Sequence, residues 1–163
     1  MSLNKKVIAA IALYFLTSFS IPADAAVSLG QKAPALTATD LAGVKVDLEG
    51  MKGKTVIVAL WASSCEPCHA EIRMLRDFYH KYEDKGVKVI ALSLDRPRNK
   101  KAVQKIAATV DYHVALAAEA TDNGFDFEEA PLVTYVINKQ GNISARFDQG
   151  PVTEEELLKA ALP

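Results

Sequence analysis

The sequence predicts an α/β fold, a central mixed β-sheet with helices packed on both of its faces. Three apolar, β-branched runs alternate with two amphipathic segments, an order typical of βαβ crossovers and parallel strands. Two later apolar runs, 132–137 and 143–147, flank Asn138-Lys-Gln-Gly-Asn142, which suits a tight reversal between antiparallel strands. The sheet should therefore contain both strand directions.

The first 25 residues have the order of a secretory signal peptide. Lys5 and Lys6 precede an apolar stretch over 7–19, and the segment up to Ala25 ends in a small-x-small pattern. An apolar run of about 13 residues is shorter than the roughly 20 needed to cross a bilayer. We expect cleavage after Ala25 and export of one domain, 26–163, to the periplasm. The alternative is a membrane anchor formed by residues 7–21.

Composition and charge narrow the classes of partner. The chain has 19 basic and 20 acidic residues, which gives a net charge of −1. A nucleic-acid-binding domain is expected to carry a strong basic excess, so no nucleic acid partner is predicted. The partner surface has to be identified from a local site.

The first part of the exported chain predicts a lead-in, a strand and a helix. Residues 33–47 have short alternating stretches around Asp40-Leu-Ala-Gly43 and suit a small hairpin or an irregular lead-in. Residues 55–61 are continuously apolar, as in a strand buried on both faces. An amphipathic helix follows from Pro67 until Gly86, with apolar residues at helical spacing: Ile72, Leu75, Phe78 and Tyr82.

The second part continues the alternation. Residues 87–94 predict another buried strand, 99–110 a second helix and 113–117 a short third strand. After the hairpin over 132–147, Thr153 and Glu156 have the spacing of a capping box, which predicts the start of the last helix.

The two cysteines lie where the first buried strand meets the first helix, in Trp61-Ala-Ser-Ser-Cys-Glu-Pro-Cys68. This junction places Cys65 beside free backbone N–H groups and the positive end of the helix dipole, which favour the thiolate that attacks disulfides. Pro67 suits the first helical turn, where its missing N–H is not needed. Cys68, one turn later, lies within disulfide reach and can resolve a mixed disulfide.

Two other uses of the cysteine pair are less well supported by the sequence. A structural disulfide is expected to close a longer loop than one of three residues. A structural zinc site needs four ligands, and the chain has no second cysteine pair or paired histidines. The pattern therefore favours redox chemistry.

The segment Trp61-x-x-x-Cys65-Glu-Pro-Cys68-x-x-Glu71 resembles the signature of the ResA/TlpA family of exported thioredoxin-like proteins. The resemblance extends to Gly30-Gln-x-Ala-Pro34, to the extra helix and strand within 99–117, and to Ala130-Pro-Leu-Val-Thr-Tyr-Val-Ile-Asn138-x-x-Gly141. It implies a thioredoxin-like fold with the helix and strand insertion of that family, and thiol–disulfide oxidoreductase activity.

The resemblance also implies roles for single residues. Pro131 matches the cis-proline that faces the disulfide, where the backbone around Ala130 can pair with an extended substrate; the plainer interpretation is a strand start. Glu71 matches an acidic residue that exchanges protons with the cysteines, against the alternative of a solvated helix-face glutamate. Glu66, between the cysteines, should oppose thiolate formation and favour a weaker oxidant.

The chain departs from related proteins at two positions. Ser64 stands where many have an aromatic residue before the first cysteine, and Ala59 where many have a buried acid or amide. Glu71 is therefore the main acid–base candidate.

Other polar residues predict no second site. His69 is interpreted as a surface histidine in the first helical turn, against the alternatives of a metal ligand or a modest pKa modulator. His80 and His113 have no ligand-like neighbours in the sequence. Charged groups at a helix entrance are usually solvated, which applies to Arg96, Arg98, Lys100 and Lys101. Glu128 and Glu129 are expected to shape partner choice electrostatically.

We expect a monomer that needs no organic cofactor or metal. The resemblance further implies that the working state is reduced and acts on protein disulfides. Its electron donor is then a membrane thiol-transfer protein, and a frequent client is an apocytochrome c awaiting haem. One alternative is a copper chaperone using Cys65, Cys68 and a distant histidine such as His113. The other is a thiol peroxidase, which requires a Pro-x-x-x-Thr-x-x-Cys segment that the sequence lacks.

Overall fold

The computed structural model describes residues 27–125 and 131–162, built around a five-stranded sheet of order β5-β4-β3-β7-β8. β3 pairs in parallel with β4, and β4 with β5, whereas β7 is antiparallel to both β3 and β8. The mixed sheet and the predicted hairpin are therefore confirmed. The strands are β3 Thr55–Trp61, β4 Val87–Ser93, β5 His113–Leu116, β7 Val133–Ile137 and β8 Ile143–Phe147.

β3 is the centre of the sheet and is buried along its whole length. Successive side chains of a strand point to opposite faces, so its residues contribute alternately to two cores. Ile57, Ala59 and Trp61 pack into the core on one face, and Val56, Val58 and Leu60 into the core on the other. This double burial is the physical basis of the continuous apolar run in the sequence.

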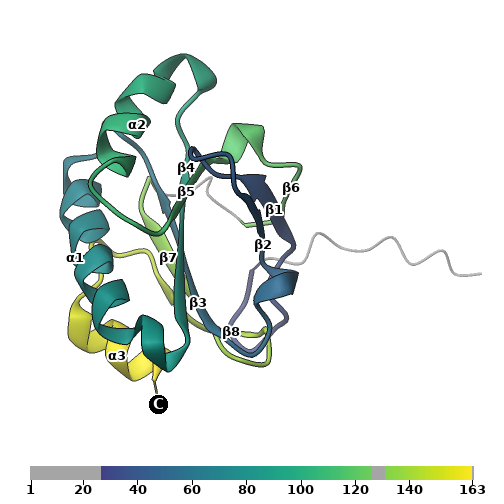
Figure 1. Cartoon of the computed structure of the whole chain (residues 1–163). Coiled ribbons are helices and arrows are strands. Elements are labelled where there is room, and N and C mark those ends of the chain that lie inside the picture. The colour runs from purple at the N-terminus through teal and green to yellow at the C-terminus, as the bar shows by residue number, and fades with distance from the viewer. Residues whose placement is uncertain (1–26, 126–130, 163) are drawn as a thin grey trace, which may run out of the picture.

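The α-helices of the described residues lie together on one face of the sheet, which corrects the expectation of helices on both faces (Figure 1). β3–α1–β4 and β4–α2–β5 step in the same direction along the sheet. Right-handed crossovers that step in one direction place their helices on one face. The helices are α1 Glu66–Tyr82, α2 Lys100–Ala107 and α3 Glu154–Ala161. A 3₁₀ turn at Glu83–Lys85 follows α1, and another at Pro97–Asn99 precedes α2.

A second, three-stranded sheet covers the opposite face (Figure 1). Its order is β2-β1-β6, with β1 Leu36–Thr39, β2 Lys45–Asp47 and β6 Asp122–Asn123 all antiparallel. The predicted lead-in hairpin is thus confirmed, while β6 was not predicted. Two further 3₁₀ turns, Glu49–Met51 and Ala117–Glu119, flank this sheet.

Asp40 ties the turn between β1 and β2 to the central sheet. Its Oδ1 accepts hydrogen bonds from the N–H groups of Ala42 and Val44, at 3.0 and 2.8 Å. Its Oδ2 lies 2.7 Å from Nδ1 of His113 at the start of β5. Burial alone would raise the pKa of Asp40, but these three contacts more than offset it and hold that pKa below its ordinary value.

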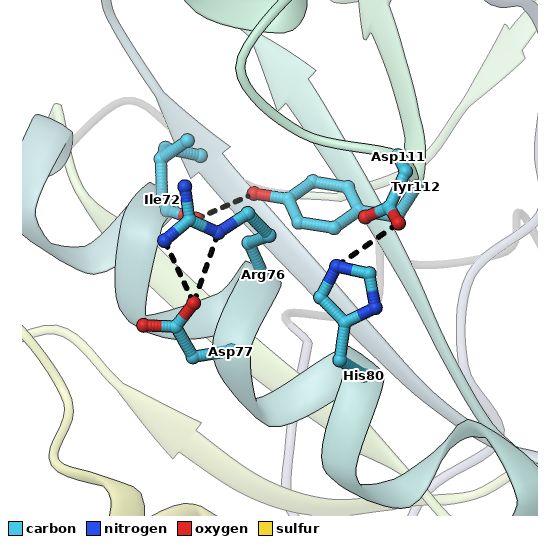
Figure 2. A network of polar contacts seen from close by, with 6 residues as sticks. All are labelled: Ile72, Arg76, Asp77, His80, Asp111 and Tyr112. Atoms are coloured by element: carbon cyan, nitrogen blue, oxygen red, sulfur yellow. Dashed lines mark hydrogen bonds and ion pairs between the residues drawn. The ribbon is translucent and has the colours of Figure 1, made fainter.

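The helix that carries the cysteines is fastened to the segment before β5 (Figure 2). The Tyr112 hydroxyl donates a 2.9 Å hydrogen bond to the carbonyl oxygen of Ile72, and His80 Nε2 lies 3.0 Å from Asp111. Figure 2 shows both contacts reaching α1 from the same short segment. α1 is therefore attached to the sheet edge at two points about two turns apart.

The predicted signal peptide, 1–25, and the alternative anchor, 7–21, lie outside the described residues. Within 27–125 and 131–162, no helix combines the length and the apolar character that crossing a membrane requires.

Candidate active site

Cys65 and Cys68 stand at the start of α1, directly after β3. Cys65 is the N-cap residue of the helix, and Pro67 occupies the first turn as the sequence predicts. The two sulfur atoms form a disulfide with an S–S distance of 2.04 Å, and the Cα atoms are 5.3 Å apart. The strand–helix junction expected from the sequence is therefore present, with the positive end of the helix dipole at Cys65.

The two sulfurs differ in exposure. Cys65 is half-buried, whereas Cys68 is fully buried in the core on the helix face. The sulfur of Cys68 lies 3.6 Å from the carbonyl oxygen of Pro131, which can accept a hydrogen bond from the Cys68 thiol once the disulfide is reduced. Pro131 itself is exposed, so the cysteine pair and this proline meet at the surface.

The expected cis peptide bond before Pro131 begins at Ala130, outside the described residues, as do Glu128 and Glu129. That expectation remains a prediction. The described part of the chain contains no cis peptide bond.

Trp61 lies behind the disulfide as part of the core. It is the last residue of β3, is completely buried and packs in the same cluster as Cys68. Its indole Nε1 has no hydrogen-bond partner among the described residues. Trp61 therefore supports the start of α1 by packing.

Glu71 lies one helical turn beyond Cys68 and is 2% exposed, which excludes a solvated helix-face position. The Thr134 hydroxyl donates a short hydrogen bond to Oε1, and the Val152 N–H donates to Oε2 at 2.9 Å. Burial raises the pKa of Glu71, and the two hydrogen bonds offset this only in part. A carboxyl group with a raised pKa, one helical turn from a cysteine pair, is suited to proton transfer.

Glu66 and His69 form the outer surface of the site. The Glu66 side chain is 92% exposed and lies 3.5 Å from His69 Nδ1. The other ring nitrogen of His69 lies 2.9 Å from the carbonyl oxygen of Ser63. Since a carbonyl oxygen only accepts, Nε2 carries a hydrogen in this contact. His69, expected to be an ordinary surface histidine, is therefore bound to the turn before Cys65.

Asp95 is a residue of the site that the sequence did not single out. It follows β4, is 7% exposed, and accepts hydrogen bonds from the Ser63 N–H and hydroxyl, both at 2.7 Å. Burial alone would raise the pKa of Asp95, but its hydrogen bonds more than offset it and keep the pKa below the ordinary value. The sequence did contain a signal for this contact. It predicts that β3 and β4 are parallel, and polar residues that follow neighbouring parallel strands meet at one edge of the sheet.

Thr134 and Val152, which bind Glu71, were also missed, and here the sequence offers no signal. They come from β7 and from the segment before α3, 63 and 81 residues beyond Glu71.

The other histidine and lysine residues considered in the sequence form contacts away from the Cys65–Cys68 disulfide. His80 pairs with Asp111 and His113 with Asp40, while Lys100 pairs with Glu119 at the exposed surface. Among residues 27–125 and 131–162, no group of three His, Cys, Asp or Glu side chains is arranged to hold a metal ion. Relative to Cys65, Val58 and Ala62 stand at the proline and threonine positions that a peroxidase segment requires.

A family model described as AhpC/TSA family matches residues 29–146, more than half of the chain. The chain belongs to the AhpC/TSA family. Among curated relatives of this AhpC/TSA protein, a thiol-disulfide oxidoreductase ResA from Bacillus cereus is 33% identical over 131 residues, covering 79% of this chain and 74% of that one. ResA from Geobacillus kaustophilus is 28% identical over 134 residues, covering 81% and 75%.

Solved structures agree with this family. A candidate thiol:disulfide interchange protein DsbE from Chlorobium tepidum superposes with a TM-score of 0.71 at 23% identity, covering 83% of this chain and 99% of that one. StoA from Bacillus subtilis gives 0.61 at 21% identity, covering 79% and 98%. At this identity the likeness establishes the fold, which is thioredoxin-like. With the ResA relatives and the Cys65–Cys68 disulfide, this AhpC/TSA protein is a thiol–disulfide oxidoreductase.

Proposed function

We propose that this oxidoreductase is an exported dithiol reductant of protein disulfides, with Cys65 as nucleophile and Cys68 as resolving cysteine. The observation that carries the assignment is the unequal exposure of the two bonded sulfurs. Cys65 is reachable at the N-cap of α1, while Cys68 is fully buried behind it. A partner disulfide therefore meets Cys65 first, where backbone N–H groups favour the thiolate.

The exchange proceeds in two displacements. The Cys65 thiolate attacks one sulfur of the substrate disulfide, forming a mixed disulfide and releasing the other substrate sulfur as a thiolate. The Cys68 thiolate then attacks the Cys65 sulfur, releasing the second substrate thiolate and forming the Cys65–Cys68 disulfide. Two electrons pass to the substrate, and the two protein thiols supply the protons for its two sulfurs.

Glu71 is proposed to exchange the proton that Cys68 must lose before the second displacement. Its burial one turn beyond Cys68 and its raised pKa support this role. The hydrogen bonds from Thr134 and Val152 keep its carboxyl group in a fixed place while the cysteines change state.

The proposed docking surface is the exposed backbone at Pro131. Its carbonyl oxygen is already 3.6 Å from the Cys68 sulfur, so an extended substrate paired beside it brings a cysteine close to Cys65. The cis isomer of the preceding bond belongs to the same proposal.

The direction of electron flow is proposed from charge and from family resemblance. The exposed Glu66 carboxylate next to Cys65 disfavours its thiolate and so favours a weaker oxidant. The ResA/TlpA resemblance supports a membrane thiol-transfer protein as electron donor and an apocytochrome c as client of a monomeric periplasmic protein, exported by residues 1–25 or anchored by 7–21. No organic cofactor or metal enters the proposed reaction.

The equilibrium reduction potential tests the direction. Full-length protein equilibrated in dithiothreitol and glutathione buffers is expected to have a potential near or below about −270 mV, the thioredoxin value. Cys65→Ala and Cys68→Ala variants are the controls, since neither can form the intramolecular disulfide. A potential near about −120 mV, typical of a strong oxidant, contradicts the reductant proposal.

A further inference from the structure

Cys65, the nucleophile, ends the turn Ala62–Cys65. Hydrogen bonds from groups outside this turn fix every polar atom of one of its residues, Ser63. The Cys65 N–H closes the turn by donating to the Ala62 carbonyl oxygen at 3.0 Å. Ser63 lies inside it, and its N–H, hydroxyl and carbonyl oxygen are all bound by groups beyond the turn. Such bonds remove the freedom that a surface turn ordinarily keeps.

Asp95 supplies two of these three bonds and is itself fixed. Its two carboxylate oxygens accept from Ser63, while Ser93 Oγ donates to Oδ2 at 2.8 Å and Asn99 Nδ2 lies 3.4 Å from Oδ1. Hydrogen bonds to an ionised acceptor are stronger than neutral ones. Asp95 therefore holds the turn as an ionised, nearly buried carboxylate.

The sheet places Asp95 where it can do this. Trp61 at the end of β3 is in register with Ser93 at the end of β4, and the Leu94 N–H donates to the Trp61 carbonyl oxygen at 2.8 Å. The segments that follow β3 and β4 therefore leave the sheet side by side. His69, on the first turn of α1, holds the Ser63 carbonyl oxygen from the helix side.

We propose that Asp95 is a positioning residue for thiol–disulfide exchange: it fixes the turn that presents Cys65 and keeps a negative charge behind it. Two separable effects follow. Loss of the acceptors frees the turn, so each Cys65 thiolate reacts more slowly. Loss of the charge alone favours the thiolate, because a nearby anion opposes it. Within residues 27–125 and 131–162, Glu66 and His69 are titratable groups next to the turn, and Arg96 follows Asp95 in the sequence.

The test uses full-length reduced protein and oxidised glutathione as the probe. All proteins are compared in a Cys68→Ala background, which leaves Cys65 as the one ionisable thiol. Thiolate absorbance against pH then gives the midpoint of Cys65 ionisation, and the rate of reaction with oxidised glutathione is divided by the thiolate fraction. Variants are Asp95→Ala, Asp95→Asn, Ser63→Ala and the double variant Ser63→Ala with Asp95→Ala. Asp77→Asn, at an exposed carboxylate on α1, is the matched control.

Asp95→Ala is expected to lower the rate per thiolate about tenfold, and Ser63→Ala a few-fold. Ser63→Ala should add nothing once Asp95 is absent, since its hydroxyl acts through Asp95. Asp95→Asn keeps one acceptor oxygen and should move the thiolate midpoint to lower pH, whereas general damage would move it toward that of a free cysteine.

A rate per thiolate in Asp95→Ala equal to that of Asp77→Asn would overturn the proposal, as would multiplying effects in the double variant. An unchanged or raised midpoint in Asp95→Asn would overturn its electrostatic half. If Asp95→Ala does not fold, Ser63→Ala and Asp95→Asn decide, because each removes less than the whole carboxylate contact.

Discussion

Glu71 is a carboxyl group that folding removes from water and then binds from two directions. Thr134 and Val152 satisfy its two oxygens, yet burial still raises its pKa. A group whose pKa is raised on folding stabilises the folded state most at low pH, where it is protonated in both states. That stabilisation is lost as pH rises from the ordinary glutamate pKa of about 4.3 through the raised value.

Glu71→Gln should therefore change how stability depends on pH. The free energy of unfolding of the native protein, relative to the variant, is expected to fall as pH rises from the ordinary glutamate pKa through the raised one, because only the native residue must ionise in the core. Urea unfolding of both proteins across this range measures the difference. A difference that does not vary with pH would show that Glu71 has an unshifted pKa.

The position of a site residue could be predicted only where the residues that contact it form a recognisable pattern in the sequence. Cys65, Cys68 and Pro67 are placed by one short segment, so their positions at the strand–helix junction followed from the sequence. The Asp95–Ser63 contact was within reach, because parallel strands end at a common edge. The partners of Glu71 come from distant segments without periodicity, so its burial in a closed network could not be read in advance.

At the scale of elements, the last helix is linked to the active-site helix through its first turn. Thr153 and Glu156 form the predicted capping box, and the neighbouring Val152 N–H binds Glu71. The cap therefore fixes both the start of α3 and one side of the Glu71 site.

Thr153→Ala is expected to lower the free energy of unfolding by about 1 kcal/mol, because it leaves an N–H group of the first helical turn without its acceptor. Urea denaturation measures this change. Lys159→Gln on the same helix is the control: its exposed ion pair with Glu155 should contribute no more than about 0.5 kcal/mol. A loss in Thr153→Ala of no more than the control's limit of about 0.5 kcal/mol would show that the cap is not important for stability.

Strand positions were predictable and helix placement was not, for a physical reason. A run of apolar residues such as 55–61 reports that both faces are covered, whatever covers them. The apolar composition of a strand does not show which element covers which face of the sheet. That depends on the direction of successive crossovers, which here leaves one face to β1, β2 and β6.

At the scale of the whole molecule, the small sheet is fitted closely against its surroundings at Gly124, which follows β6. A Cβ atom there would lie 2.8 Å from Cβ of Pro34, in the segment before β1. The Gly124 N–H also donates to the Ala35 carbonyl oxygen at 3.1 Å, so the two segments are held in contact. Neither proline nor backbone can move aside easily.

Gly124→Ala should accordingly destabilise the protein by about 1–3 kcal/mol through overpacking. The matched control is Gly50→Ala, whose Cβ would meet nothing closer than 4.0 Å. Thermal unfolding of the two variants compares them. If both melt like the native protein, the small sheet is not packed as tightly as the Pro34 contact indicates.

The burial of Cys68 also determines the order in which partners can act. With one reachable sulfur, any thiol that reduces the Cys65–Cys68 disulfide and any disulfide that the reduced pair attacks must both bond to Cys65. The two cannot be bound covalently at the same time. Each turnover therefore alternates between two half-reactions, and each half-reaction forms its mixed disulfide at Cys65. Steady-state kinetics should then be ping-pong, with the thiol reductant and the disulfide substrate competing for the Cys65 sulfur.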